Sequence, residues 1–283
     1  MPIANLPHPS AADIAARRRA FRDLHASGCF IIPNAWDVGS ARMLEGMGFK
    51  ALASTSSGFA WSQGKPDSGV ARDDVLTHLR ELVAATGLPV NADFESGYAQ
   101  DADGVAESVS MAVDTGVAGL SIEDASGDPA QPIRDLADAV DRIRAARRAI
   151  DAAGGDVMLI GRAENFLHGR NDLADTVARL QAYSQAGADC LYAPGLRTPD
   201  QISAVVQAVA PKPVNLLVGW SSDLDLSQIA ALGVRRVSVG GALARAAWGG
   251  FMRAARMLAD EGRFTGFADA ASGQSLDAFF RAR

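Results

Sequence analysis

The chain has 283 residues, of which 48% are hydrophobic and 21% are charged, and its formal net charge is −6 at pH 7. The composition is typical of a soluble globular protein, and the length is enough for one large domain or two small ones. The acidic net charge argues against nucleic-acid binding. The chain contains no apolar run of about 18 residues, the length needed for a transmembrane helix.

The start of the chain lacks an apolar segment of signal-peptide length, and only two cysteines occur, Cys29 and Cys190. Both lie in apolar runs, which favours buried free thiols and a reducing compartment. We therefore expect a cytoplasmic protein.

Short apolar segments alternate with helical segments along the chain. The first predicted helix spans residues 10–26, with Ser10 as its N-cap and Asp13 three positions later. The predicted strands lie at 29–34, 51–55, 89–93, 119–123, 157–162, 189–193, 213–218 and 236–240. The helices that follow them lie at 37–47, 72–86, 101–115, 133–153, 172–186, 199–210, 223–232 and 242–261.

The eight strand–helix units predict an α/β fold, a (β/α)8 TIM barrel with parallel strands. The strands are apolar without alternation, as expected when both faces of a sheet are covered. A doubly wound open sheet is the alternative, but no Gly-x-Gly-x-x-Gly motif follows the first strand. We expect a single domain over residues 1–283, with the barrel at about 28–262, an extra N-terminal helix and a C-terminal segment at about 263–283.

Charged side chains follow three of the predicted strands. Asp93 and Glu95 lie two residues apart and would project to the same side if the strand continues. Glu123 ends the next strand, and Arg162 and Glu164 end the one after it. Strand ends share one face of a barrel, so these groups predict a common pocket whose carboxylates suit a divalent cation. Helix capping or internal ion pairing is the alternative for each of them.

Two further segments could contact an anionic ligand. Ser57 and Gly58 follow the second strand, where hydroxyls and backbone amides could hold a carboxylate, although a plain Ser/Gly loop would have the same sequence. Asp67 lies in the next loop, within reach of the barrel mouth. The guanidinium of Arg162 could bind a substrate carboxylate or pair permanently with Glu164 or Glu123.

Several other chemistries are poorly supported. A Schiff-base aldolase needs a lysine at the catalytic face, but two of the three lysines precede strands and Lys65 lies in a loop. No two histidines have the spacing of zinc ligands, and only His168 is expected near the mouth, where it could touch substrate or serve a loop. A Gly-x-Ser-x-Gly nucleophile motif is absent.

The motifs at the strand ends resemble those of the phosphoenolpyruvate mutase/isocitrate lyase superfamily over about residues 21–251. The resemblance rests on Asp93-x-Glu95-x-Gly97-Tyr98, Ile122-Glu123-Asp124, Gly161-Arg162-Ala163-Glu164 and Ser57-Gly58. It implies a barrel that binds Mg2+, with Mn2+ as the alternative, and small 2-oxo acids. It also implies a homo-oligomer, a dimer or tetramer, in which C-terminal helices are exchanged between subunits.

The resemblance also implies a role for each candidate residue. Asp93, Glu95 and Glu123 would hold the metal, some of them through water. Asp67, Arg162 and Glu123 would be catalytic, with Asp67 beside the metal's waters. The residues implied to bind substrate are Ser57, Gly58, Phe59, Asp93, Arg162 and Asn215, of which Arg162 would hold the group far from the 2-oxo end.

The segment after the fourth strand departs from the family. Isocitrate and methylisocitrate lyases resemble each other in a Lys-Lys-Cys-Gly-His segment there, whereas residues 124–132 contain no cysteine, lysine or histidine. We therefore expect a magnesium-dependent lyase that cleaves a C–C bond of, or decarboxylates, a small 2-oxo or 2-hydroxy dicarboxylate such as oxaloacetate through an enolate. The alternatives are P–C chemistry of the phosphonopyruvate hydrolase or phosphoenolpyruvate mutase type, and a non-catalytic 2-oxo acid-binding protein.

Overall fold

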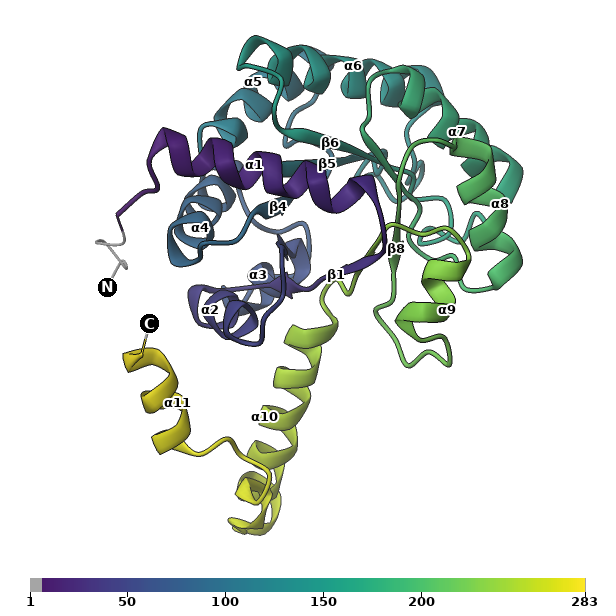
Figure 1. Ribbon diagram of the computed structural model, residues 1–283. Helices are drawn as coiled ribbons and strands as arrows, with labels where there is room; N and C mark the ends of the chain where they lie inside the picture. Colours follow the sequence, from purple (N-terminus) through teal and green to yellow (C-terminus); the bar gives the residue numbers. More distant parts are fainter. Residues whose placement is uncertain (1–6, 283) are drawn as a thin grey trace. The chain divides into compact units, whose positions relative to one another are not determined.

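Nine short parallel strands form one curled sheet in the computed structural model, which describes residues 7–282 (Figure 1). The strands are β1 Phe30–Ile32, β2 Asn34–Ala35, β3 Leu52–Ser54, β4 Val90–Asp93, β5 Gly119–Glu123, β6 Met158–Arg162, β7 Cys190–Tyr192, β8 Val214–Leu217 and β9 Arg236–Ser238. Their order in the sheet is β1-β9-β8-β7-β6-β5-β4-β3-β2. The predicted TIM barrel is confirmed.

The predicted first strand is divided into β1 and β2 by Pro33. β1 pairs with β9, with Phe30 opposite Arg236, and β2 pairs with β3, with Asn34 opposite Ala53. Proline has no backbone N–H, so it interrupts the ladder on its donor side, while its carbonyl still accepts a 2.9 Å hydrogen bond from the Ala53 amide. The barrel closes through this short connection between its first and last strands.

Helices follow the strands largely where the sequence predicts them. Their bounds are α1 Ala11–Ala26, α2 Val38–Gly46, α3 Ser56–Ser62, α4 Arg72–Ala85, α5 Ala102–Val113, α6 Leu136–Ala152, α7 Leu173–Gln185, α8 Pro199–Val209, α9 Leu226–Ala231, α10 Ala242–Glu261, the 3-10 turn η1 Thr265–Phe267 and α11 Gly273–Arg281. No helix was predicted between the second strand and residue 72, where the structure has α3. Helix α6 begins later than predicted because Ile133 forms an antiparallel bridge with Ala125.

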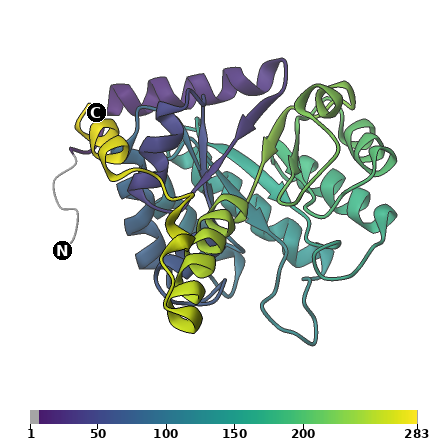
Figure 2. The same cartoon turned by 90° about the horizontal axis from the view of Figure 1, so that it is seen from below.

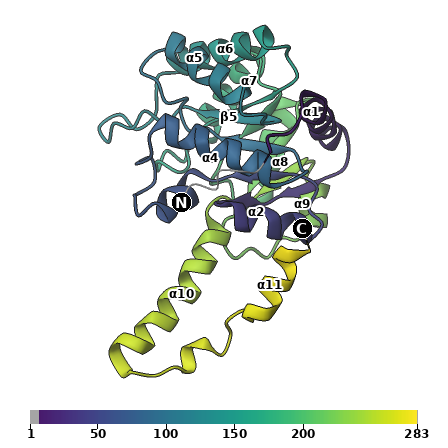
Figure 3. The ribbon, with the colours of Figure 1, turned by 90° about the vertical axis from the view of Figure 1, so that its left-hand side faces the viewer.

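The barrel helices cover the outer face of the strands (Figure 2), and neighbours such as α4, α5 and α6 lie side by side (Figure 3). Helix α1 begins with the predicted capping box of Ser10 and Asp13. Arg18 of α1 donates hydrogen bonds to the carbonyls of Val113 and Val117, in the segment that precedes β5. Helix α1 therefore packs at the N-terminal ends of the strands, opposite the predicted mouth.

The barrel interior changes from apolar to polar along its axis. Phe21 of α1 is fully buried against Met158, Ile160 and Cys190, which lie on β6 and β7. Side chains two residues apart on a strand share a face, so Arg162 points into the interior above Ile160. Toward the C-terminal strand ends the interior is therefore polar and able to hold a ligand.

The chain divides into two compact units, residues 1–241 and 242–283. The first unit contains the barrel strands. The second contains α10, η1 and α11, and within it η1 folds back so that Gly266 lies against Ala254 and Met257. The sequence-based expectation placed α10 in the barrel, whereas its contacts group it with the C-terminal residues. No helix in the described residues is long and apolar enough to cross a membrane.

Candidate active site

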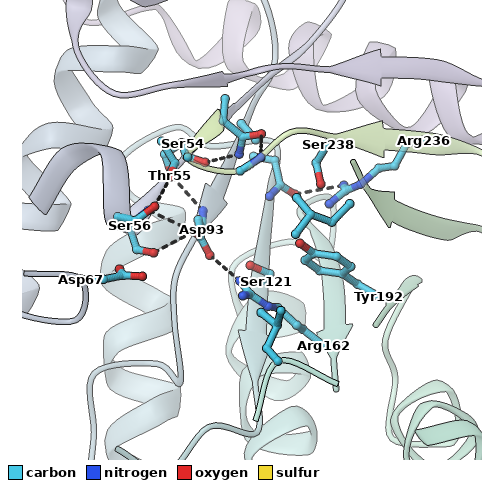
Figure 4. A pocket seen from close by; sticks show the side chains of 18 residues that line it. Ser54, Thr55, Ser56, Asp67, Asp93, Ser121, Arg162, Tyr192, Arg236 and Ser238 are labelled. Atoms are coloured by element: carbon cyan, nitrogen blue, oxygen red, sulfur yellow. Dashed lines mark hydrogen bonds and ion pairs between the residues drawn. The ribbon is translucent and has the colours of Figure 1, made fainter. Parts of the chain in front are cut away.

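Two adjoining cavities open at the C-terminal ends of the strands. One has a volume of about 180 Å³ and is lined by residues that include Ser57, Asp67, Asp93 and Arg162 (Figure 4). The other has a volume of about 450 Å³, and its lining includes Glu95 and Glu123 together with Asp67 and Arg162. Six predicted site residues thus line connected spaces. Such volumes suit a small metabolite, since drug-sized ligands occupy about 300–1,000 Å³.

Three other predicted site residues lie outside these linings. Gly58 is buried, and its amide donates to the Thr55 hydroxyl at the start of α3. The ring of Phe59 stacks on His78 with a centroid separation of 3.8 Å. Asn215 is buried and hydrogen-bonded to Ser238. Roles for these three in contacting substrate remain predictions.

Arg162 forms three ion pairs within the site. Its Nη1 lies 3.1 Å from Asp93 Oδ1 and 3.1 Å from Glu123 Oε2, and its Nε lies 2.5 Å from Glu164 Oε1. Its guanidinium also lies 5.0 Å from the ring centroid of Tyr192. Burial alone would lower the pKa of Arg162, but Glu123 and Glu164 raise it well above its ordinary value. The structure therefore contains the ion pairs of Arg162 with Glu164 and Glu123 that were the alternative to its binding a substrate carboxylate.

Negative charge nevertheless exceeds positive charge around Arg162. Burial raises the pKa of Asp67 and of Glu95, and repulsion from Asp93 raises both further. Burial also raises the pKa of Glu123 well above its usual range, although Arg162 opposes that shift. A cation bound beside such carboxyl groups would stabilise their ionised form.

Glu95 reaches the site by a route that the sequence did not indicate. Strand β4 ends at Asp93, so the expected alternation does not extend to Glu95. Its backbone has φ 46°, a left-handed conformation that is uncommon for residues other than glycine. Its Oε1 accepts a 2.7 Å hydrogen bond from the Tyr98 hydroxyl, and the backbone of Tyr98 has φ 53°. A tight left-handed turn, not strand geometry, therefore directs Glu95 toward the cavity.

The start of α3 is held by Asp93. Asp93 Oδ2 accepts hydrogen bonds of 3.0 Å from both the amide and the hydroxyl of Ser56. The Thr55 side chain caps the helix and lies 3.1 Å from Ser57 Oγ. Asp93, a predicted metal ligand, is thus hydrogen-bonded to the start of α3, the segment that was predicted to hold the carboxylate of the substrate.

The donors fit a largely hydrated magnesium ion better than an ion enclosed by protein. No group of three or more His, Cys, Asp or Glu side chains between residues 7 and 282 is arranged to hold a metal directly. Magnesium commonly uses one or two carboxylates, with water and substrate as its other ligands. Asp67, Asp93, Glu95 and Glu123 provide oxygen donors and excess negative charge for such an ion.

The segment between β5 and α6 forms a short closed loop beside the larger cavity. The Ala125–Ile133 bridge and a 2.9 Å hydrogen bond from Ser126 N to Pro132 O close its base. Ala125, Ser126 and Gly127 line the cavity, as does His168 from the segment after β6. His168 thus lies where the sequence placed it, 4.0 Å from Glu164 Oε2.

Polar side chains deeper in the barrel, none of them among the predicted site residues, also line the smaller cavity. They are Asn91, Ser121, Tyr192, Arg236 and Ser238. Asn91 and Asp93 alternate on β4, and Arg236 and Ser238 alternate on β9, so each pair faces the interior. A polar residue inside a short apolar strand was the signal that could have identified them.

The sequence is similar to one protein family and to several individual proteins. Residues 21–259 match the family described as phosphoenolpyruvate phosphomutase. An uncharacterized protein of Mycobacterium tuberculosis is 33% identical over 243 residues, covering 85% of this chain and 89% of its own. An oxaloacetate decarboxylase of Paraburkholderia xenovorans is 32% identical over 235 residues, covering 78% of this chain and 74% of its own.

Solved structures show the same barrel. A candidate lyase/mutase from Burkholderia cenocepacia has a TM-score of 0.92 and 49% identity, covering 95% of this chain and 98% of its own. Oxaloacetate acetylhydrolase in complex with oxalate has a TM-score of 0.84 and 26% identity, covering 94% of each chain.

Proposed function

Because this chain belongs to the phosphoenolpyruvate mutase/isocitrate lyase superfamily, we propose that it is a magnesium-dependent carbon–carbon lyase. Its substrate would be a small 2-oxo or 2-hydroxy dicarboxylate of the oxaloacetate type. The observation that carries the proposal is the acidic group Asp67, Asp93, Glu95 and Glu123 around a cavity of about 180 Å³ and its neighbour. The similarity to an oxaloacetate decarboxylase and to oxaloacetate acetylhydrolase supports the substrate class.

Each residue of the site would have a role that follows from its position. Asp93, Glu95 and Glu123 would hold magnesium, directly or through water, and Asp67 would bind a water beside it. A bound magnesium ion would supply charge stabilisation at the 2-oxo oxygen. The Ser57 hydroxyl would contact the carboxylate next to that oxygen. Arg162 would hold Asp93 and Glu123 in position and offset part of their mutual repulsion, because its guanidinium contacts both.

The loop at residues 125–133 supplies no side chain to the larger cavity that could transfer a proton in step with bond cleavage, which leaves His168 and the acids of the site as the titratable groups there. The loop residues that line the larger cavity are Ala125, Ser126 and Gly127, none of which titrates near neutral pH. Carbon dioxide or a stable acid is an easier leaving group under these conditions than an aldehyde. We therefore rank decarboxylation of oxaloacetate or C–C cleavage of a substituted malate above isocitrate cleavage.

Phosphorus–carbon chemistry is the second candidate, because the matching family is described as phosphoenolpyruvate phosphomutase. A substrate panel with magnesium separates the candidates: oxaloacetate, alkylmalates, isocitrate, methylisocitrate and phosphonopyruvate. We expect turnover of oxaloacetate or an alkylmalate well above the rate with magnesium alone. Clear preference for phosphonopyruvate or isocitrate would contradict the proposal, and no turnover of any compound would favour a binding protein.

A further inference from the structure

A second guanidinium lies deeper in the same barrel. Arg236 is the first residue of β9, only 2% exposed, and it lines the smaller cavity, with Asp93 and Asp67 to its left in Figure 4. Its Nε donates a 2.8 Å hydrogen bond to Asn215 Oδ1, and its Nη1 donates a 3.3 Å bond to Asn91 Oδ1. A guanidinium has five N–H donors, so these two bonds leave donors for a ligand.

Arg236 differs from the other buried arginines in its lack of a counterion. Between residues 7 and 282, the arginines classed as buried are Arg18, Arg142, Arg179 and Arg236. The first three each form an ion pair with an aspartate, at 2.9, 3.1 and 3.0 Å respectively. In the same part of the chain, Arg236 forms no ion pair with an Asp or Glu side chain. A buried, uncompensated charge is costly, and an anionic ligand would offset that cost.

The surroundings of Arg236 contain other polar groups but no negative charge to compensate it. Burial lowers the pKa of Arg236, and the opposing influences come from Cys190 and Tyr192, whose own pKa values burial raises. Cys190 and Tyr192 are therefore neutral near pH 7. The guanidinium thus presents its charge to the cavity with neutral neighbours around it.

We propose that Arg236 binds the carboxylate of the substrate that lies farthest from the magnesium end of the site. Arg162 is the residue expected from the sequence for this role, but Asp93, Glu123 and Glu164 already neutralise it. Arg236 has no such partners and lines the same small cavity from β9. A ligand with anionic groups at both ends would contact the acid-bound cation at one end and Arg236 at the other.

This inference rests on the proposed function and adds a specificity determinant to it: Arg236 selects dicarboxylates over monocarboxylates. Malate and lactate test it directly, because both are stable 2-hydroxy acids and only malate carries the second carboxylate. Binding of each acid is measured by calorimetry with magnesium for the wild type, Arg236→Met, Arg236→Lys and Arg235→Met. Arg235 is the matched control, since it is the neighbouring arginine and donates to the Gly28 carbonyl instead of facing the cavity.

We expect the wild type and Arg235→Met to prefer malate over lactate by about 10- to 100-fold, the range for hydrogen bonds to charged groups. Arg236→Met should lose that preference through weaker malate binding, with lactate binding unchanged. Arg236→Lys should retain only part of it, because an ammonium cannot form two parallel contacts with a carboxylate. Arg236→Met also leaves Asn215 Oδ1 and Asn91 Oδ1 without their donors, so its melting temperature is measured beside binding.

Retention of the full malate preference by folded Arg236→Met would overturn the assignment. If that variant fails to fold, full preference in Arg236→Lys would overturn it equally. A wild type that binds neither acid would overturn both this inference and the proposed function. If the preference depends on Arg236 but no dicarboxylate is turned over, the assignment of Arg236 stands and the lyase proposal fails.

Discussion

At the scale of single residues, Arg162 explains how five acids can surround one small space. Its ion pairs with Asp93, Glu123 and Glu164 offset part of their mutual repulsion, although the three acids outnumber it. Asp67 and Glu95 add further negative charge nearby. A site that keeps an excess of buried carboxylates is suited to a cation that arrives with the substrate.

The substitution Glu123→Gln tests that excess charge. It removes one negative charge while nearly preserving shape, and Arg162 retains Asp93 and Glu164. We expect lyase activity to fall about 100-fold or more, as when an electrostatic contact to a transition state is lost, and to require more magnesium. The measurement is kcat against magnesium concentration, with Asp128→Asn in the exposed loop as the control. Unchanged activity after chelator treatment would show that the metal assignment is wrong.

The sequence was sufficient to find residues at strand ends but not those within strands. Asp93, Glu123 and Arg162 end their strands, and parallel strands bring those ends together. Arg236 begins a strand that was predicted to be apolar. Its proposed role in binding a carboxylate depends on the lack of an Asp or Glu partner beside its guanidinium. Whether a buried arginine has a counterion is a property of packing, so the pattern of residue types did not reveal it.

At the scale of elements, α3 is the main difference between expectation and structure. Ser56 to Ser62 is rich in serine and glycine, residues that favour turns over helix interiors. The helix forms because Thr55 caps it, Asp93 binds its first amide and Phe59 packs on His78 of α4. Two of these three contacts come from distant parts of the chain, so local sequence preference could not predict them.

Burial of His78 makes stability depend on pH. Burial lowers the pKa of His78 from 6.5 to about 4. The unfolded chain therefore binds a proton before the folded chain does, and stability falls as pH decreases from about 6.5 to about 4, by about 1.4 kcal/mol per unit of pKa difference. His78→Phe should reduce this slope in denaturant titrations over that range. An unaltered slope in His78→Phe would refute the explanation.

The connection between β1 and β2 gives a second prediction at this scale. Asn34 donates a 2.6 Å hydrogen bond to the Ser54 carbonyl and accepts bonds of 3.0 and 2.8 Å from the Val239 and Gly240 amides. Asn34→Ala leaves these groups without partners and should lower the free energy of unfolding by about 2–5 kcal/mol. Chemical denaturation measures the change, with exposed Asn171→Ala as the control. A loss as small as that of the control would mean that water replaces the side chain.

At the scale of the whole molecule, the second unit exposes several large apolar side chains. Ala244 is the one residue of the described helix α10 that is fully buried. Phe251 is 62% exposed and Phe264 is 73% exposed, and Trp248 and Phe267 are also exposed. The rings of Trp248 and Phe251 lie edge to face with centroids 5.5 Å apart, and large exposed apolar patches mark protein–protein contacts. We therefore keep the prediction of a homo-oligomer assembled through C-terminal helices.

Deletion of residues 266–283 tests this prediction. The truncation removes α11 and its aromatic residues, so we expect loss of the native oligomer or of solubility. Size-exclusion chromatography with light scattering and thermal melting measure both effects. A truncated protein with the same mass in solution and the same melting temperature as the full chain would contradict the prediction. The matched control is Met47→Ser, which alters an exposed apolar residue of the barrel unit.

The division of the first strand at Pro33 has a consequence for the time at which the cavity forms during synthesis. β1 cannot pair until β9 has been synthesised, and Asn34 accepts a hydrogen bond from a backbone amide that lies 205 residues later in the chain. Ribosomes add about 5–20 residues per second, so this partner emerges roughly ten seconds or more after Asn34. Until then β1 is an unpaired edge that could associate with other chains. Arg236 also arrives with β9, so a nascent chain acquires the deep end of its pocket at the same moment as its barrel closes.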